Sequence, residues 1–173
     1  MRYRSRAREE IQQHLEDEAA ADGVDLQGMV EPGFGYPNGS YEYIIANALL
    51  DAAAIRQPDD AELLNLKGLV VEQQSGSEAA IPYFKRSIEI DPDNVQGLFN
   101  VGRYYYNLAA TAGEKLSGNA LKKKVVPLYR QAQPYMERVH RLDPANTDAT
   151  DALRTIYYRT GEGRKLQELE QGK

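Results

Sequence analysis

Apolar residues recur at helical intervals along most of the chain. Within residues 95–110, one such face carries Leu98, Val101, Tyr105 and Leu108. A longer stripe alternates steps of four and three residues, through Leu121, Val125, Leu128, Ala132, Tyr135, Val139 and Leu142. Because steps of three and four bring side chains to one face of an α-helix, the pattern predicts an all-α fold.

Two prolines, Pro127 and Pro134, fall inside the longer stripe without changing its period. A proline in a helix interior costs about 3 kcal/mol and usually kinks the helix. The unbroken stripe therefore predicts one long, bent helix. A break at Pro127 into two helices is the alternative.

Capping and turn residues divide the rest of the chain into shorter helices. A narrow apolar stripe over 5–21 predicts a first helix, and the glycine- and proline-rich stretch 23–40 predicts a long loop. A helix is expected over 41–56. Asp59 with Glu62 has the spacing of a capping box and predicts a helix to about Gln74. Three further helix starts are expected. One lies at Ser77, after Gly76, and the next at Asp93 or Asn94. The last lies at Asn146 or Thr147 and begins a final helix pair that is divided at 161–163.

Two stretches of the sequence are near copies of each other. Residues 80–86 (AIPYFKR) lead to Asp91-Pro92, and residues 132–138 (AQPYMER) lead to Asp143-Pro144. Internal repetition of this kind indicates that one helical unit has been stacked on a copy of itself.

Each copy carries the same kinds of residue at the same intervals. The first has Leu64, Gly68, Val71, Ala80, Phe84 and Pro92, and the second has Leu98, Gly102, Tyr105, Ala132, Met136 and Pro144. This pattern resembles the tetratricopeptide repeat, a helix–turn–helix unit of about 34 residues. The resemblance implies a right-handed helical-hairpin solenoid of two to three such repeats, with an inserted long helix and a C-terminal capping helix pair.

The resemblance also implies a division of the chain. Residues 1–40 do not match and form an N-terminal helix and glycine- and proline-rich loop, degenerate or capping. Residues 41–173 form the repeat domain. Its parts are a partial repeat at 41–60, a repeat at 61–94, a repeat at 95–146 with about eighteen additional residues, and a capping pair at 147–173.

Small residues are expected to allow close helix packing in both repeats. Gly68 and Ala80 in one unit, and Gly102 and Ala132 in the next, let two helices approach where larger side chains would separate them. The larger leucine, phenylalanine, methionine and tyrosine side chains then fill the space between neighbouring pairs, because no single pair can bury its own apolar face.

Composition excludes several functional classes. The 173 residues have a net charge of −5, which gives no overall electrostatic reason to favour nucleic acid. No cysteine is present, so disulfides and thiolate metal sites are excluded. The basic residues 1–10 lead into no apolar run, and no stretch approaches the about 20 apolar residues of a membrane span. We expect no membrane insertion, and the sequence does not indicate a compartment.

Residues that could carry catalysis are few. His14 lies beside Glu16, Asp17 and Glu18, which favours a solvated acidic helix face over a metal site, and His140 is expected at the surface. The loop 33–40 is rich in glycine but lacks the pattern of a phosphate-binding loop. We therefore expect no enzymatic activity and no cofactor. An enzyme-associated or metal-binding site formed by this loop and His14 is the least favoured alternative.

Three consecutive lysines, Lys122, Lys123 and Lys124, lie close in sequence to several tyrosines. Basic and aromatic side chains together bind single-stranded nucleic acid. Three lysines neutralise few phosphates, however, and acidic residues outnumber basic ones. We expect no nucleic-acid partner.

The resemblance implies a protein-binding function. In such repeats the first helix of each pair lines a concave groove, so the chain is expected to act as a scaffold or adaptor that binds a protein or peptide. The predicted contact residues are Asn65, Leu69, Phe99, Asn100, Arg103, Tyr106 and Tyr158. The two asparagines would bond the peptide backbone, while Arg103 and Tyr106 would select its side chains. A self-associating structural module, using the uncovered part of the 121–142 stripe, is the alternative.

Overall fold

The computed structural model describes residues 49–171 apart from 115 and 117, and it describes no side chain at position 121. In this part of the chain the protein is all-α, without strands. Residues 49–56 are helical, and the helices that follow are α3 (Ala61–Ser75), α4 (Ser77–Ile90), α5 (Val95–Glu114), α6 (Gly118–Leu142), α7 (Thr147–Thr160) and α8 (Gly163–Glu170). The predicted helix at 5–21, the loop at 23–40, His14 and most of the helix at 41–56 lie outside the described residues.

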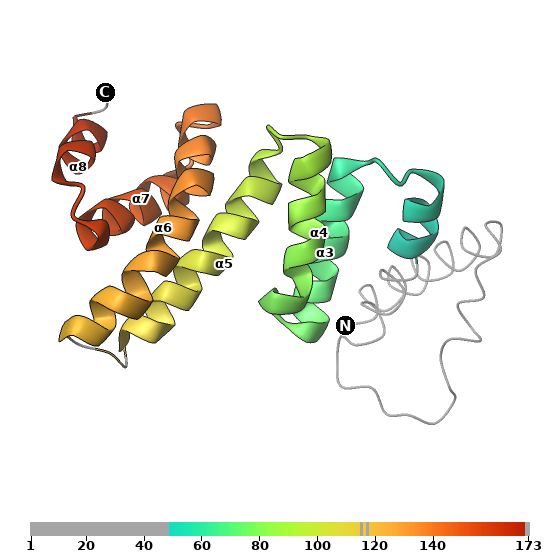
Figure 1. The fold of residues 1–173 in the computed structure, drawn as a ribbon. Coiled ribbons are helices and arrows are strands. Elements are labelled where there is room, and N and C mark those ends of the chain that lie inside the picture. Colours follow the sequence, from blue (N-terminus) through green and yellow to red (C-terminus); the bar gives the residue numbers. More distant parts are fainter. Residues whose placement is uncertain (1–48, 115, 117, 172–173) are drawn as a thin grey trace, which may run out of the picture.

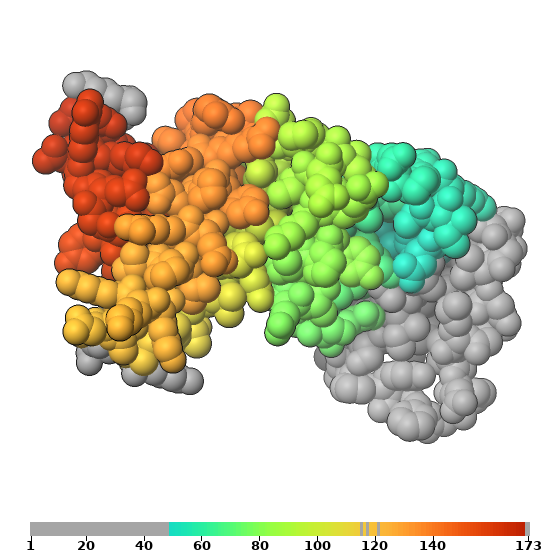
Figure 2. Space-filling view, viewed as in Figure 1, coloured from blue at the N-terminus to red at the C-terminus, as the bar shows by residue number. Residues whose placement is uncertain are grey.

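The described helices form a row in which each helix packs mainly on its neighbours in sequence (Figure 1). Helices α3 and α4 form one pair, α5 and α6 form a second and longer pair, and α4 packs against α5 between them. Helix α7 packs on α6, and α8 packs on α7. The space-filling view shows the resulting elongated molecule (Figure 2). None of these helices combines the length and the apolar character needed to cross a lipid bilayer.

Polar caps explain where three of the helices begin. Asp60 accepts a hydrogen bond from the Leu63 backbone N–H at 2.9 Å, Asn94 from that of Gly97 at 2.7 Å, and Asn146 from that of Ala149 at 2.9 Å. These bonds satisfy backbone donors that have no partner inside the helix. Of the predicted alternatives, Asn94 and not Asp93, and Asn146 and not Thr147, are the caps. The predicted capping box at Asp59 and Glu62 is wrong by one residue, since Asp60 is the cap.

The predicted cap at Ser77 is also wrong. Gly76 occupies the N-cap position with φ of 85°, a value that favours glycine, and gives no side-chain cap. Ser77 is the first residue of α4, and its hydroxyl donates to Glu72 Oε1 at 2.6 Å. The serine therefore ties the end of α3 to the start of α4.

Two glycines allow the close approach within each helix pair. A Cβ on Gly68 of α3 would lie 2.4 Å from Cε1 of Phe84 on α4, and a Cβ on Gly102 of α5 would lie 3.0 Å from Cε of Met136 on α6. Real Cβ contacts are longer than the first of these distances. Ala80 and Ala132 are both fully buried. The corresponding residues of the two near-copies therefore lie in similar surroundings, as the small-residue prediction required.

The buried side chains form two clusters that touch. Ala80, Ile81, Phe84 and Val101 make the smaller cluster, between α3, α4 and α5. The larger one joins α5, α6 and α7 through Leu98, Ala109, Val125, Tyr129, Ala132, Met136, Val139, Ala149, Ala152, Leu153, Ile156 and Tyr157. Ile88, Tyr105 and Tyr135 pack against both clusters, so the core is continuous along the row.

Helix α6 runs unbroken through Pro127 and Pro134, which are both exposed. The prediction of one long helix is confirmed, the alternative break at Pro127 is wrong, and the helix changes direction along its length (Figure 1). The predicted apolar stripe is only partly right. Tyr129 and Met136 are buried in place of Leu128 and Tyr135, which are half-buried, and Leu142 is 38% exposed.

Candidate functional site

The predicted contact residues lie on the first helix of each pair and on α7, but their surroundings differ. Asn65 and Leu69 belong to α3, Phe99, Asn100, Arg103 and Tyr106 to α5, and Tyr158 to α7. Their exposure ranges from 3% for Asn65 to 72% for Tyr158. Their capacity to contact a partner has to be judged residue by residue.

Asn65 and Asn100 are both buried and hydrogen-bonded to each other. The Asn100 side-chain Nδ2 donates to Asn65 Oδ1 at 3.1 Å, and Asn65 Nδ2 donates to Gln96 Oε1 at 3.1 Å. Buried amides are expected to be paired, because an unpaired one retains its desolvation cost. In this structure the two asparagines join α3 to α5, in place of the predicted hydrogen bonds to a peptide backbone.

Arg103 forms a second bridge between the same two helices. Its Nη2 lies 2.6 Å from Glu72 Oε2, with side-chain exposures of 38% for Arg103 and 17% for Glu72. Glu72 also accepts from Ser77, so both of its oxygens are engaged. The pair fixes the position of the guanidinium group, while part of Arg103 stays open to solvent.

Leu69 and Phe99 are half-buried at the margin of the core. Leu69 packs against the smaller cluster and Phe99 against the larger one. Each therefore presents only part of its side chain to solvent. Leu66, two turns before Gln73 and Gln74 at the end of α3, is more accessible, with an exposure of 51%.

Aromatic residues from three helices gather around Tyr129 and the end of α7. The Tyr106 ring meets the Tyr129 ring edge-on with centroids 5.6 Å apart. Burial raises the pKa of the Tyr129 hydroxyl, and the positive charge of nearby Arg159 partly opposes this rise. Arg159 also lies 6.0 Å from the centroid of the Tyr158 ring. Of these residues Tyr158 and Arg159 are exposed, Tyr106 is half-buried and Tyr129 is buried.

A hollow that sequence reasoning missed lies beside the asparagine bridge. Its volume is about 440 Å³, and it is lined by Glu62, Asn65, Leu66, Asp91, Asp93, Asn94, Val95 and Gln96. The lining joins the start of α3 to the turn before α5, which are far apart in sequence. The Asp-Pro-Asp-Asn motif marks the turn, but only the folded chain brings it against Glu62 and Leu66.

A polar network joins the C-terminal helices to α6. Glu137 Oε1 accepts from Gln133 Nε2 at 2.9 Å, Tyr157 Oη at 3.0 Å and Lys165 Nζ at 2.8 Å. Burial would raise the pKa of Glu137, but these three donors outweigh it and hold that pKa below its ordinary value. Burial and the adjacent Glu137 charge raise the pKa of Tyr157 far above its ordinary value. The network is structural, since it holds α7 and α8 against α6.

Groups suited to catalysis or metal binding are sparse in the described residues. Within 49–171, His, Asp and Glu form no group of three or more arranged to hold a metal ion. His140 is half-buried, and its Nδ1 lies 3.0 Å from Thr150 Oγ1, so the surface position predicted for it is only partly right. The alternative site at residues 33–40 and His14 lies outside the described residues.

The alternative of self-association depended on an uncovered stripe along α6. In the structure Val125, Ala132 and Val139 are fully buried between α6 and its neighbours. Leu142 remains partly exposed. Leu128 and Tyr135 are half-buried, so the described part of the stripe is only partly covered, and the self-association alternative stays a prediction.

Comparison of the sequence with models of known protein families gives no match, and comparison with curated proteins gives none either.

Proposed function

We propose that the chain is a short right-handed stack of two to three tetratricopeptide-like helix pairs that acts as a non-enzymatic scaffold or adaptor for a protein partner. In this proposal α3–α4 and α5–α6 are the repeats at 61–94 and 95–146, the length of α6 reflects the insertion, and α7–α8 is the capping pair. Residues 41–60 supply a partial repeat.

The equivalence of two close contacts carries the proposal. Gly68 meets Phe84 in the first pair, and Gly102 meets Met136 in the second, with fully buried Ala80 and Ala132 at matching positions. Two pairs built in the same way stack side by side and leave the first helix of each pair with a partly exposed face. On α5 this face carries the half-buried Arg103 and Tyr106, and on α7 Tyr158 is 72% exposed.

Arginine and tyrosine are the residue types most often responsible for binding energy at protein interfaces. Arg103 is held by Glu72 and Tyr106 by Tyr129, so both side chains are ordered before a partner arrives. Less conformational entropy is then lost on binding. The buried Asn65 and Asn100 hold α3 and α5 together beneath this face through their hydrogen bond.

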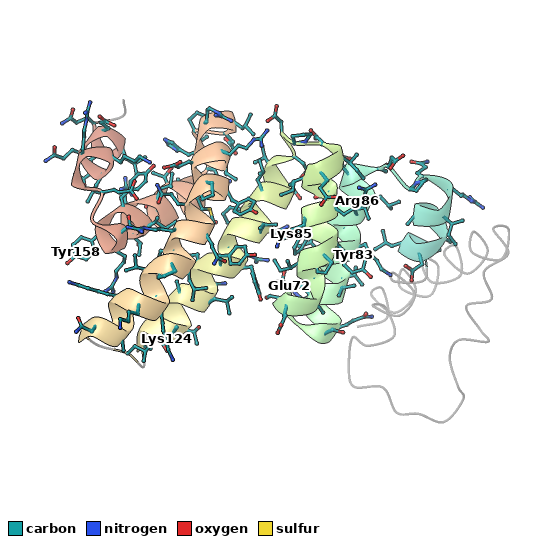
Figure 3. All side chains as sticks on the ribbon, viewed as in Figure 1. Glu72, Tyr83, Lys85, Arg86, Lys124 and Tyr158 are labelled. Atoms are coloured by element: carbon teal, nitrogen blue, oxygen red, sulfur yellow. The ribbon has the colours of Figure 1, made fainter. Side chains whose placement is uncertain are left out.

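Peptide selection tests the proposal. Peptides that bind the full chain are first selected from a displayed random library. They should bind an Arg103→Ala/Tyr106→Ala variant, with unchanged circular dichroism, at least about tenfold more weakly than they bind the parent chain. The control variant Tyr83→Ala/Arg86→Ala removes the same residue types from α4, where Figure 3 labels both residues. It should bind the peptides as the parent chain does. If both variants lost the same affinity for the peptides, or if neither variant lost any, this binding face would be ruled out.

A further inference from the structure

The N-terminal half of α6 carries a concentration of positive charge. Residues 115–136 include Lys115, Lys122, Lys123, Lys124 and Arg130 and no acidic residue. This segment is therefore basic, although the net charge of the whole chain is −5. The side chains of Lys122, Lys123, Lys124 and Arg130 are all exposed. Figure 3 labels Lys124 near the tip of the α5–α6 hairpin, and long side chains project from this part of the surface in Figure 2.

These four cations form no ion pair within the described part of the chain. Most of the other described basic side chains do: Lys67, Arg86, Arg103, Arg138, Arg154, Arg164 and Lys165 each pair with a carboxylate. Even the highly exposed Arg164 is paired, with Glu168. The N-terminal half of α6 therefore holds four exposed cations without a carboxylate partner in the described residues, more than any other described helix.

Aromatic surface adjoins this basic segment. Lys122 lies two helical turns before Tyr129 on the same face of α6, and Tyr129 is buried in one cluster with Ile156 and Tyr157 of α7. Arg159 forms no ion pair in the described residues and stacks near Tyr158, which is 72% exposed. Lysines, arginines and a large exposed ring thus lie on adjoining parts of α6 and α7.

We propose that this basic surface, formed by Lys122, Lys123, Lys124, Arg130, Tyr158 and Arg159, binds an acidic segment of a protein partner. The inference rests on the proposed adaptor function and adds to it a second contact region and the chemistry of the partner. Lys123 and Arg130 share a face of α6 and lie about 10 Å apart along the helix. A peptide in the polyproline II conformation has three residues per turn and rises about 3.1 Å per residue, so glutamates or aspartates three apart lie on one side of it, about 9 Å apart, and would meet both cations.

Charge density favours a protein segment over nucleic acid. A nucleic acid presents a phosphate at each nucleotide, and strong binding requires many of them to be neutralised. Four or five cations on a chain with net charge −5 neutralise few. A short acidic peptide needs no more, and its apolar side chains gain from contact with the Tyr158 ring.

Fluorescence anisotropy with the full chain tests the inference. The probe is a labelled peptide in which glutamate alternates with leucine and glycine, and the reference probe has glutamine at each glutamate position. The glutamate peptide should bind at least about tenfold more tightly than the glutamine peptide at about 50 mM salt. The variant Lys122→Gln/Lys123→Gln/Lys124→Gln should lose at least about tenfold of that affinity. Arg86→Gln/Arg141→Gln/Arg164→Gln removes the same amount of charge elsewhere and should lose less than about threefold.

Several outcomes would overturn the inference. Equal binding of the two peptides would do so, and so would equal effects of the two triple variants. A third such outcome is lysine-dependent binding of single-stranded oligothymidylate or of phosphatidylserine vesicles that is tighter than binding of the glutamate peptide. Lysine-dependent self-association in sedimentation would instead identify a second copy as the occupant. The Arg103→Ala/Tyr106→Ala variant separates this test from that of the adaptor face. It should bind the glutamate peptide as the parent does, so one test can fail while the other succeeds.

Discussion

Asn65 and Asn100 face each other in the interior of the protein, with Asn100 Nδ2 donating to Asn65 Oδ1 at 3.1 Å. They are 3% and 7% exposed. Helices α3 and α5 belong to different helix pairs, and this bond and the Glu72–Arg103 pair connect them directly. The relative position of the two pairs therefore depends on polar contacts as well as on the apolar core.

Removing either asparagine should weaken the fold through the partner left behind. We expect Asn65→Ala and Asn100→Ala each to lower the free energy of unfolding by about 1–3 kcal/mol, because each leaves a buried amide without its bond. The double variant should cost less than the sum, with a coupling of about 0.5–3 kcal/mol. Urea unfolding of the four chains measures this. Strict additivity would show that the two side chains act independently.

The change in stability on replacing a glycine by alanine should depend on the space available for the new Cβ. Gly68→Ala should cost about 1–3 kcal/mol, because the new Cβ would lie 2.4 Å from Phe84 Cε1 and force the ring or the helix to move. Gly102→Ala should cost less, because its neighbour Met136 is flexible and lies 3.0 Å away. Thermal unfolding of the series gives the order.

Gly113 provides the matched control for that series. A Cβ there would lie 3.8 Å from Val125 Cγ1, an ordinary contact, and the residue is within α5. Gly113→Ala should therefore stabilise the protein by roughly 0.5–1 kcal/mol, since alanine favours the helix. Similar losses at positions 68 and 113 would contradict the close-packing explanation.

The stability contributed by Glu137 should depend on pH. Burial acts to raise the pKa of Glu137, but hydrogen bonds from Lys165, Gln133 and Tyr157 hold it below its ordinary value of 4.5. A carboxylate with a lowered pKa in the folded state stabilises that state above its unfolded pKa. This contribution is lost as the pH falls from about 4.5 through the lower folded value. The attachment of α7 and α8 to α6 should weaken in that range.

Unfolding measured between about pH 6 and about pH 3 checks this dependence. Glu137→Gln should be less stable than the parent at neutral pH, and its stability should fall less steeply below about pH 4.5. Glu170→Gln, which removes an exposed carboxylate at the end of α8, should keep the parent's slope. An unchanged slope in Glu137→Gln would show that Glu137 contributes nothing to the acid sensitivity of the protein.

Much of the described fold could be predicted from local sequence. Helical periodicity gave α6 as one helix despite Pro127 and Pro134, since a single face stays apolar on both sides of each proline. Asn94 and Asn146 marked helix starts because their side chains bond backbone groups within the next turn. The errors at Asp59 and Ser77 are also local, since adjacent polar residues compete for one cap.

The candidate site was less predictable, because exposure is a property of the packed helices. Asn65 and Asn100 carry the same polar amide as a peptide-binding asparagine, and only their burial against each other distinguishes them. The lysines at 122–124 are visible in the sequence, but only the folded chain shows that they have no carboxylate partner among the described residues.

The sequence by itself determined the all-α class, the helix boundaries near asparagines and glycines, and the two near-copies, because these depend on interactions within a few residues. Only the tertiary structure decided which polar groups are used internally and which stay open. Pairings such as Asn65 with Asn100, Glu72 with Arg103 and Glu137 with Lys165 join residues on different helices, and no periodicity along the chain specifies which helix faces meet.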